Sequence, residues 1–517
     1  MVNDPLKREN KGGGYTLLIG FALFKLVIHL ITNTWGGYGY FRDELYYLAC
    51  SDHLAAGYVD EPPLSIFILY ANRALLGDSI FMLRLLPAIL GAITVFTVGL
   101  ITRELGGKRF AQSIACIASI ASLGNLAMNT YYSMNAFEIF FWVWTAYLVI
   151  RLINTGDWVY WVFIGCILGL GMLNKISVLW LAFGIYAGIL LTPQRHWFKT
   201  MYPYIAGVIA LAIFSPFIIW NMLHDFAHLE FIRNATNIKY QSVTEADFIE
   251  GQILVQNPLT LPLWLAGIGF FFFIKEGKKF IAIGWIYVAT LLILLGNFHS
   301  KPEYLSPAYG MLFAGGGIAF ERMLTLRTVS WIKPLYAAIL VVGGLVLAPV
   351  TLPILPVETF IHYSDVLGIS PTTSEAHELD KLPQFYADMF GWEDKAAAVA
   401  EVYHTLTPDE QSRCAIYADN YGRCGAIDLF GKKYGLPPSI GSHNNYWLWG
   451  PRDYTGELVI ILGGELRDKQ DKFQSVTIAR IVKSEYCLPY ENNLNIYVCR
   501  GLKVPLRELW PTLKTYI

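Results

Sequence analysis

Long apolar segments fill most of the first 350 residues and constrain the fold of this chain more than any other feature. A transmembrane helix needs about 20 mostly apolar residues, with a range of about 17–25, and eleven segments loosely meet this length. They centre near residues 15–35, 81–102, 110–130, 135–153, 157–174, 176–192, 202–221, 258–274, 280–297, 305–321 and 332–350. With 55% hydrophobic and only 15% charged residues, the chain is predicted to be a mainly α-helical, polytopic membrane protein.

Basic residues recur in alternate loops between these segments and predict the orientation, because Lys and Arg concentrate on the cytoplasmic side of a membrane. The clusters are Lys7, Arg8 and Lys11; Arg103, Lys108 and Arg109; Arg151; Arg195 and Lys199; Lys275, Lys278 and Lys279; and Arg322 and Arg327. An odd number of spans that begins in the cytoplasm ends outside it. We therefore expect a cytoplasmic N-terminus, with the loop 36–80 and everything after residue 352 on the outer face.

The last third of the chain differs in kind from the rest. Charged residues are distributed throughout it, and short alternating runs at 458–462 and 495–498 are typical of strands. We predict two domains, a transmembrane module over 1–352 and an extracytoplasmic α/β domain over 353–517. An oxidising compartment would permit disulfides there, and small buried thiols are the alternative; the sequence does not choose a pairing among Cys414, Cys424, Cys487 and Cys499.

The first outer loop holds two pairs of adjacent acidic residues beside the bilayer. Asp43 and Glu44 open a short helical pattern, and Asp60 and Glu61 precede a proline pair that favours the start of a second helix. Both helices are predicted to lie along the membrane surface. Helix capping alone is the simpler explanation of either acidic pair. A functional site is favoured because other polar residues reach the same face: Asn135, Glu138, Lys175, His224, Asp225, His228, Arg233, Lys301 and Glu303.

Several short motifs resemble the lipid-linked glycosyltransferases of the GT-C fold. They are FRDELYY at 41–47, GYVDEPPL at 57–64, YSMNAFE at 132–138, GLGMLNK at 169–175, KPEYLSPAY at 301–309 and SHNNYWLWGP at 442–451. The resemblance is to glycosyltransferase family 39, the dolichyl-phosphate-mannose-protein mannosyltransferase-like proteins of bacteria, which include the aminoarabinose transferases of lipid A. It covers nearly the whole chain, and it implies a multi-pass protein of the bacterial inner membrane.

This resemblance implies an inverting transfer of a monosaccharide from a polyprenyl-phosphate donor to an extracytoplasmic acceptor, which is a glycan, lipid or protein. The family's catalytic carboxylate corresponds to Asp43, with Glu44 beside it. A carboxylate that takes the acceptor's proton as general base accelerates such a step roughly 100- to 10,000-fold. Cations would stabilise the departing lipid phosphate. The predicted substrate-binding residues are Tyr46, Tyr47, Arg73, Asn135, Glu138, Lys175, Arg233, Lys301 and Tyr304.

The sequence departs from the family pattern at two places. Many relatives have an aspartate where this chain has Asn135, which leaves Glu138 as the nearby acid. The aminoarabinose transferases have a lysine where this chain has Glu61. One interpretation is a site for a divalent cation (Mn, Mg or Zn), held by Asp60 and Glu61 with His224 or His228, since carboxylate and imidazole suit such ions. The other interpretation is that these histidines are ordinary polar residues of a loop.

Other functions and roles stay open at this point. A lipid-linked sugar flippase or transporter is one alternative function, although transporters usually place functional charges near the bilayer midplane and often show internal repeats, which this sequence lacks. A non-catalytic homologue that only binds the lipid-linked sugar is another. In the C-terminal part, aromatic rings beside amides at 419–422 and 444–449 are suited to acceptor recognition or to domain packing. A net charge of −1 argues against a nucleic-acid partner.

Overall fold

The computed structural model describes residues 13–373, 375 and 377–517, so the predicted basic cluster of Lys7, Arg8 and Lys11 lies outside the described residues. The chain forms two compact units, each of which is described by itself. The helical unit comprises residues 1–35, 84–215 and 242–354. The mixed unit comprises residues 36–83, 216–241 and 355–517, and it therefore contains the first predicted outer loop together with the C-terminal third of the chain.

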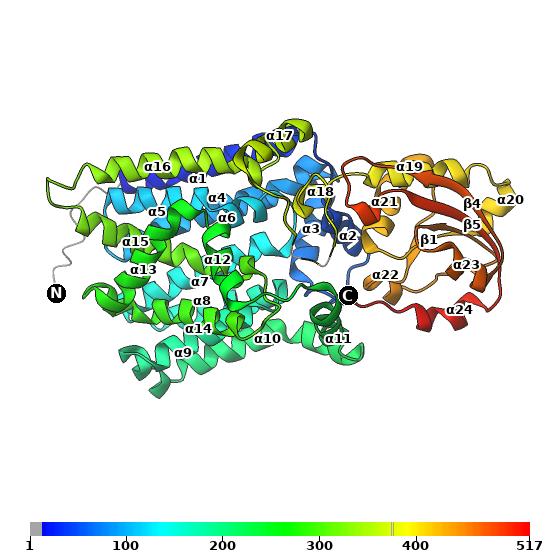
Figure 1. The fold of residues 1–517 in the computed structure, drawn as a ribbon. Coiled ribbons are helices and arrows are strands. Elements are labelled where there is room, and N and C mark those ends of the chain that lie inside the picture. Colours follow the sequence, from blue (N-terminus) through cyan, green and yellow to red (C-terminus); the bar gives the residue numbers. More distant parts are fainter. Residues whose placement is uncertain (1–12, 374, 376) are drawn as a thin grey trace. The chain divides into compact units, whose positions relative to one another are not determined.

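The helical unit is built from a bundle of mostly apolar helices (Figure 1). Its helices are α1 (Gly13–Trp35), α4 (Ile80–Glu104), α5 (Arg109–Ala121), α6 (Leu123–Met128), α7 (Met134–Thr155), α8 (Val159–Asn174), α9 (Val178–Leu190), α10 (Tyr202–Leu223), α12 (Glu245–Val255), α13 (Leu261–Phe273), α14 (Ile281–Leu295), α15 (Tyr309–Met323) and α16 (Ile332–Leu347), of which α4 and α10 continue into the mixed unit. Between α13 and α15, a side chain at Gly267 would collide with the Leu312 carbonyl, and one at Gly316 with the Leu263 carbonyl. Glycine at these positions lets the two backbones approach closely, as is common between membrane helices.

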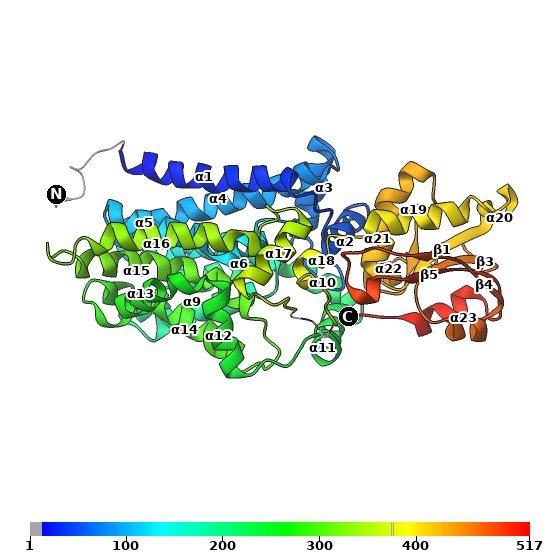
Figure 2. The same cartoon turned by 45° about the horizontal axis from the view of Figure 1, so that its top comes forward.

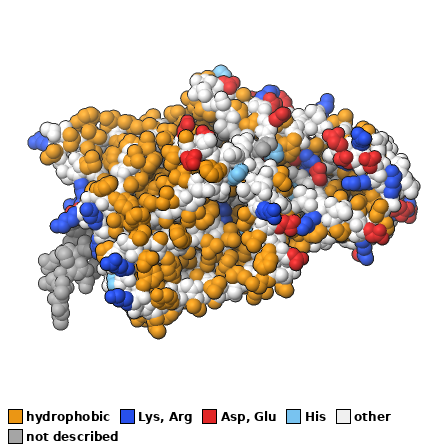
Figure 3. Space-filling model, turned by 60° about the horizontal axis from the view of Figure 1, so that its bottom comes forward, with side chains coloured by type: hydrophobic (Ala, Val, Ile, Leu, Met, Phe, Trp, Pro, Cys, Tyr) orange, Lys and Arg blue, Asp and Glu red, His pale blue; other side chains and the backbone are white. Residues whose placement is uncertain are grey.

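The predicted count of eleven spans is not confirmed. Among the described residues, six helices are long and apolar enough to cross a membrane, and a seventh span results if α12 and the helical stretch Pro258–Phe273, bent by 90°, count as one. Several apolar segments are shorter in the structure because polar caps interrupt them. The segment 110–130, for example, breaks at Ser122, whose hydroxyl accepts a hydrogen bond from the Asn125 N–H and starts α6. Figure 3 shows apolar side chains over much of the surface of the helical unit, as lipid contact requires.

The mixed unit combines short helices with one sheet. Its helices are α2 (Arg42–Ser51), α3 (Leu64–Leu76), α11 (Ala227–Asn234), α17 (Val357–Leu367), α18 (Gln384–Ala387), α19 (Trp392–Tyr403), α20 (Pro408–Arg413), α21 (Tyr421–Phe430), α22 (Asn445–Leu448), α23 (Leu466–Lys472), α24 (Leu506–Leu509) and the 3-10 helix η10 (Trp510–Leu513). The first outer loop forms two helices, α2 and α3, and α3 begins directly after the proline pair 62–63.

The sheet confirms the predicted mixed α/β character of the C-terminal part. Its strands are β1 (Cys414–Ala418), β2 (Ile440–Gly441), β3 (Leu458–Leu462), β4 (Phe473–Val482) and β5 (Leu494–Leu502), in the order β2-β1-β3-β5-β4. Strand β1 is parallel to β2 and β3, whereas β5 is antiparallel to β3 and β4. Helices α19 and α21 cover one face of the sheet and α23 and α24 the other (Figures 1 and 2). All seven cysteines are free thiols in the structure.

Candidate functional site

The first turn of α2 separates the two acidic residues that the sequence singles out. Glu44 is fully buried, and its carboxylate accepts a hydrogen bond from the Phe41 N–H at 2.8 Å. This contact stabilises the start of α2, and it is the contact that the third residue of a helix makes in a capping box. The neighbouring Asp43 side chain is 34% exposed, which leaves its carboxylate accessible to a substrate.

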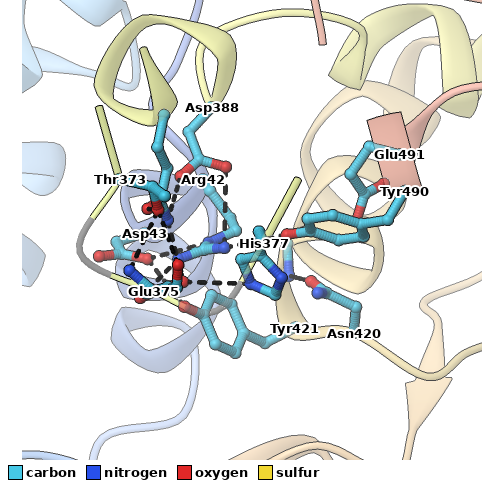
Figure 4. Close-up of polar contacts among 12 residues, drawn as sticks. Arg42, Asp43, Thr373, Glu375, His377, Asp388, Asn420, Tyr421, Tyr490 and Glu491 are labelled. Atoms are coloured by element: carbon cyan, nitrogen blue, oxygen red, sulfur yellow. Dashed lines mark hydrogen bonds and ion pairs between the residues drawn. The ribbon is translucent and has the colours of Figure 1, made fainter. Parts of the chain in front are cut away.

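Arg42, the first residue of α2, lies buried among three carboxylates (Figure 4). Its guanidinium nitrogens are 3.3 Å from Glu375, 3.7 Å from Asp388 and 3.5 Å from Asp43. It also donates a hydrogen bond to the Tyr490 hydroxyl at 3.1 Å. One buried cation thus holds the accessible carboxylate of Asp43 next to two acids from a distant segment of the chain. We call Arg42, Asp43, Glu375 and Asp388 the arginine cluster.

The arginine cluster contains more acid than a single guanidinium can neutralise. Glu375 has further basic neighbours, with the Lys239 ammonium at 3.6 Å and the His377 ring at 3.4 Å. Burial raises the pKa of Asp388 to about 7, although the Arg42 guanidinium opposes this increase. A buried carboxyl that keeps its proton near neutral pH relieves the repulsion between neighbouring acids. The charge of the cluster therefore depends on pH in the physiological range.

Tyr421 supplies the second contact of Asp43. Its hydroxyl donates a hydrogen bond to the Asp43 carboxylate at 2.9 Å, and its ring lies 4.7 Å from that of Tyr46, measured between centroids. Tyr421 is the first residue of α21, and the Asn420 side chain caps that helix by accepting a hydrogen bond from the Gly422 N–H at 2.7 Å. The segment 419–422, predicted as an acceptor-recognition candidate, thus contributes the residue that orients Asp43.

Tyr46 connects the second acidic pair to the C-terminal segment. Its hydroxyl donates a hydrogen bond to Asp60 at 2.8 Å and accepts one from the Asn445 amide at 2.5 Å. The Asn445 side-chain oxygen in turn accepts the Val59 N–H at 3.2 Å. Burial raises the pKa of Asp60 to about 6 and that of Glu61 well above its ordinary range. The Asp60 carboxylate raises the pKa of Glu61 further, and the Asp43 carboxylate raises the pKa of both. The pair therefore holds a proton more readily than an exposed acid does.

The structure does not support the interpretation of a divalent cation between the acidic pair and a histidine. No group of three or more His, Cys, Asp or Glu side chains able to hold a metal ion occurs in the described part of the chain. The His224 ring donates to the Trp220 carbonyl at 2.7 Å, and the His228 ring donates to the Val59 carbonyl at 3.0 Å. Backbone carbonyls thus orient both histidine rings, and neither ring is oriented by a metal ion shared with Asp60 and Glu61.

The two predicted arginines have different surroundings. The Arg73 guanidinium lies 2.6 Å from both Asp52 and Asp78, and it donates to the Leu48 carbonyl at 3.0 Å. These contacts tie α3 to the end of α2 and occupy its donors. Arg233, in the last turn of α11, is exposed. A free phosphate oxygen therefore has easier access to Arg233 than to Arg73.

Four of the predicted binding residues meet within the helical unit. The Lys175 ammonium donates hydrogen bonds to the Asn135 side-chain oxygen and to the Glu138 carboxylate, both at 2.7 Å, and it lies 5.1 Å from the centre of the Tyr304 ring. Glu138 is buried and also accepts a hydrogen bond from the Ser177 hydroxyl at 2.5 Å. Lys301 is half-buried at the start of the 3-10 helix Pro302–Ala308.

Sequence reasoning missed several members of the site. Glu375 and Asp388 belong to the arginine cluster, and Lys239 and His377 contact it, but all four lie in segments without a periodic pattern. More than 300 residues separate Arg42 from Glu375. No local signal in the sequence brings them together, and only an excess of acid in the segment 375–388 could have drawn attention to it.

Comparison with known proteins agrees with this description of the fold and the motifs. Residues 60–220 match the model of the dolichyl-phosphate-mannose-protein mannosyltransferase family. Two undecaprenyl phosphate-alpha-4-amino-4-deoxy-L-arabinose arabinosyl transferases, from Pseudomonas paraeruginosa and Pseudomonas aeruginosa, are each 25% identical over 218 residues, which is 39% of this chain. The matched region also spans only 39% of the length of these relatives.

The solved structures show the fold over a larger part of the chain. The crystal structure of ArnT from Cupriavidus metallidurans bound to undecaprenyl phosphate has a TM-score of 0.62 and 12% identity, and the match covers 94% of this chain and 98% of that one. The apo state of the same protein also gives 0.62, over 93% and 97%. The predicted class, a protein of the GT-C glycosyltransferase fold, is therefore confirmed. Within that class, the predicted resemblance to the aminoarabinose transferases is confirmed as well.

Proposed function

We propose that this protein is a membrane glycosyltransferase that moves a monosaccharide from a polyprenyl phosphate to an extracytoplasmic acceptor. The observation that carries the proposal is the environment of Asp43: a carboxylate accessible to substrate, held by the Tyr421 hydroxyl and by Arg42 in a cluster whose other acids are buried. A position fixed from two sides is what a general base requires. The family match over residues 60–220 supports this class of reaction.

In the proposed reaction, an acceptor hydroxyl attacks the anomeric carbon of the donor sugar from the face opposite the lipid phosphate. The new carbon–oxygen bond forms as the bond to the phosphate oxygen breaks, so the configuration inverts. The hydroxyl proton passes to Asp43, and the electron pair of the broken bond leaves with the polyprenyl phosphate. Tyr421 keeps the Asp43 carboxylate oriented during this step and does not itself exchange a proton.

The departing phosphate needs positive charge, because negative charge develops on its bridging oxygen. We assign this role to Lys175, Lys301 and Arg233. Lys175 is the best prepared of the three, since Asn135 and Glu138 fix its ammonium within the helical unit. Arg73 is left out of the proposal because two carboxylates, those of Asp52 and Asp78, pair with its guanidinium, whereas Lys175 is paired with the single carboxylate of Glu138.

Recognition of the sugar and the acceptor is proposed for the rings and amides around Asp60. Tyr46, Asn445 and Asp60 form a connected hydrogen-bond network. Such networks of hydroxyl, amide and carboxylate groups are suited to sugar hydroxyls. We further propose that this part of the chain faces the extracytoplasmic side of a bacterial inner membrane and that the N-terminus is cytoplasmic.

The proposal is tested with the purified full-length protein and a panel of polyprenyl-phosphate monosaccharides. Mass spectrometry would follow the release of polyprenyl phosphate in the presence of candidate glycan, lipid and peptide acceptors. The proposal predicts acceptor-dependent release from at least one donor. Binding of a donor without any release, across all acceptors, would contradict the proposal and would favour a non-catalytic lipid-sugar binding protein. Movement of the intact donor across vesicle membranes would instead favour a flippase.

A further inference from the structure

The residues that follow η10, 514–517, run beside the first residues of the SHNNYWLWGP motif. The Thr515 N–H donates a hydrogen bond to the Ser442 carbonyl at 3.0 Å, and the Thr515 carbonyl accepts one from the Asn444 N–H at 2.9 Å. These two bonds form a parallel β-bridge between Thr515 and His443. We call residues 514–517 the strap.

Side chains from two other segments of the mixed unit also hold the strap. The Asn444 side chain bonds Ile517 twice: its oxygen accepts the Ile517 N–H at 3.0 Å, and its nitrogen donates to the Ile517 main-chain oxygen at 3.2 Å. The Asn234 side chain donates to the Tyr516 carbonyl at 2.9 Å. Asn444 itself has a φ of +47° and a ψ of −124°. Such a strained backbone persists only where surrounding contacts fix it, and the two bonds to Ile517 are among those contacts.

His443 connects the strap to the first residue of α21. Its Nε2 donates a hydrogen bond to the Ile517 main-chain oxygen at 2.8 Å, and its Nδ1 accepts one from the Tyr421 N–H at 3.4 Å. A neutral imidazole has one donor and one acceptor, so these contacts fix the tautomer with the proton on Nε2. The His443 ring also lies 4.6 Å from the Tyr421 ring, measured between centroids. His443 therefore contacts both the backbone and the ring of the residue whose hydroxyl bonds Asp43.

This connection requires a neutral His443. In a protonated ring both nitrogens are donors, so Nδ1 would no longer accept the first N–H of α21. Burial lowers the pKa of His443 to about 3. The cations Lys239 and Arg42 lower it further, whereas the hydrogen bond to the strap and the Glu375 carboxylate raise it. The strap is part of the burial because it contacts Nε2, so it helps to keep the ring neutral.

We infer that His443 positions the general base: held by the strap, it fixes Tyr421, and Tyr421 orients the Asp43 carboxylate. This role rests on the proposed function, since it serves the proposed base. His443 acts through Tyr421 and is a positioning residue. The next residue of the motif, Asn445, bonds the Tyr46 hydroxyl. Adjacent residues of one motif thus hold the two tyrosines that contact Asp43 and the second acidic pair.

The first test does not depend on sugar transfer. Hydrogen exchange of the full-length protein in nanodiscs, resolved by electron-transfer fragmentation, follows the Tyr421 amide. In His443→Ala this amide should exchange at least about fivefold faster, whereas the Cys424 amide, which is bonded within α21, should keep its rate. The matched control is His404→Ala, because the exposed His404 ring also contacts a main-chain carbonyl. Unchanged exchange at Tyr421 in His443→Ala would overturn the connection.

The second test measures the acceptor-dependent release of polyprenyl phosphate. His443→Ala should lower kcat about fivefold with little change in KM, and by no more than Tyr421→Phe does, because His443 acts through Tyr421. In the Tyr421→Phe background, His443→Ala should have no further effect on kcat, since residues that act as a unit are not additive. A double variant whose loss is the product of the two single losses would overturn the inference.

The same assay separates this inference from the proposed function. Transfer by the wild-type protein with an unchanged kcat in folded His443→Ala would contradict the inference alone. An absence of transfer in the wild-type protein would contradict the proposed function, and the exchange of the Tyr421 amide would still decide whether His443 fixes Tyr421.

Releasing the strap should make transfer sensitive to acid. Removal of residues 514–517 exposes His443, and Asn444→Gly, which suits the positive φ, releases the strap if the shortened chain does not fold. The pKa of His443 should then return toward its ordinary value of 6.5, so kcat should fall to the His443→Ala level between about pH 8 and about pH 5. Asp60 and Asp388 titrate in every variant, so each profile is compared with that of the wild type. Adding His443→Ala should remove the difference, and wild-type profiles in both folded variants would refute the role of the strap.

Discussion

Replacing Arg42 by methionine probes the arginine cluster directly. Arg42 is buried, and its guanidinium lies within 3.7 Å of Glu375, Asp388 and Asp43. Methionine keeps much of the volume but leaves the carboxylates without their shared cation. Breaking a buried ion pair by removing one partner costs about 3–5 kcal/mol. At about 2–4 °C per kcal/mol for a domain of about 150–250 residues, this cost corresponds to a fall in Tm of about 6–20 °C.

The assay is thermal unfolding followed by intrinsic tryptophan fluorescence, at one scan rate and in one detergent for all variants. The matched control is Arg480→Met, because Arg480 and its partner Glu401 are 45% and 57% exposed, and an exposed pair contributes only about 0–1 kcal/mol. The double substitution Arg42→Met and Asp388→Asn removes one acid as well and should recover part of the loss. An Arg42→Met protein with the same Tm as Arg480→Met would refute the argument that this cluster stabilises the mixed unit.

Three further predictions concern the mixed unit and one concerns the helical unit. Burial raises the pKa of Asp388 from its ordinary value of 3.8 to about 7 and that of Asp60 to about 6. Between pH 4 and pH 7 the folded state therefore holds protons that the unfolded chain has already lost, so Tm should fall as the pH rises through this range. Asp388→Asn should flatten this dependence of Tm on pH. Tyr421→Phe removes the hydroxyl that orients the general base, so kcat should fall about tenfold with little change in KM, measured by steady-state release of lipid phosphate. Glu44→Ala should lower the stability of the protein by about 1 kcal/mol, the usual contribution of a helix cap, with transfer retained when assayed below the new Tm. Lys175→Met should weaken binding of polyprenyl phosphate at least about tenfold in a direct binding assay, because it removes the cation that we assign to the phosphate; unchanged binding would remove Lys175 from that role.

The fold class could be predicted because its signals are long and redundant. Apolar segments such as 202–221 extend over many residues, and the short apolar run at 458–462 has polar and glycine residues on both sides, as a strand between turns does. The number of spans was harder to predict, because hydropathy does not show where a polar cap such as Ser122 divides an apolar stretch into two shorter helices. Length and composition therefore identify a membrane protein before they give its topology.

The candidate site was predictable only where its residues are close together in the sequence. Asp43 and Glu44 were identified from one motif, and the structure separates them into an accessible carboxylate and a buried cap. The partners of Arg42 could not be found in this way, since Glu375 and Asp388 come from irregular segments that only the tertiary fold brings near α2. Packing of chain segments far apart in sequence creates this part of the site.

The most direct test of the account is the rate at which the Asp43→Asn protein transfers sugar to an acceptor hydroxyl. The amide preserves the size of the side chain but cannot accept the proton, so the released polyprenyl phosphate should fall at least about 100-fold. Binding of the donor should be retained, and Asp471→Asn, which changes an exposed carboxylate of the same unit, should behave like the wild type. Undiminished transfer by folded Asp43→Asn protein would contradict the assignment of Asp43 as the general base.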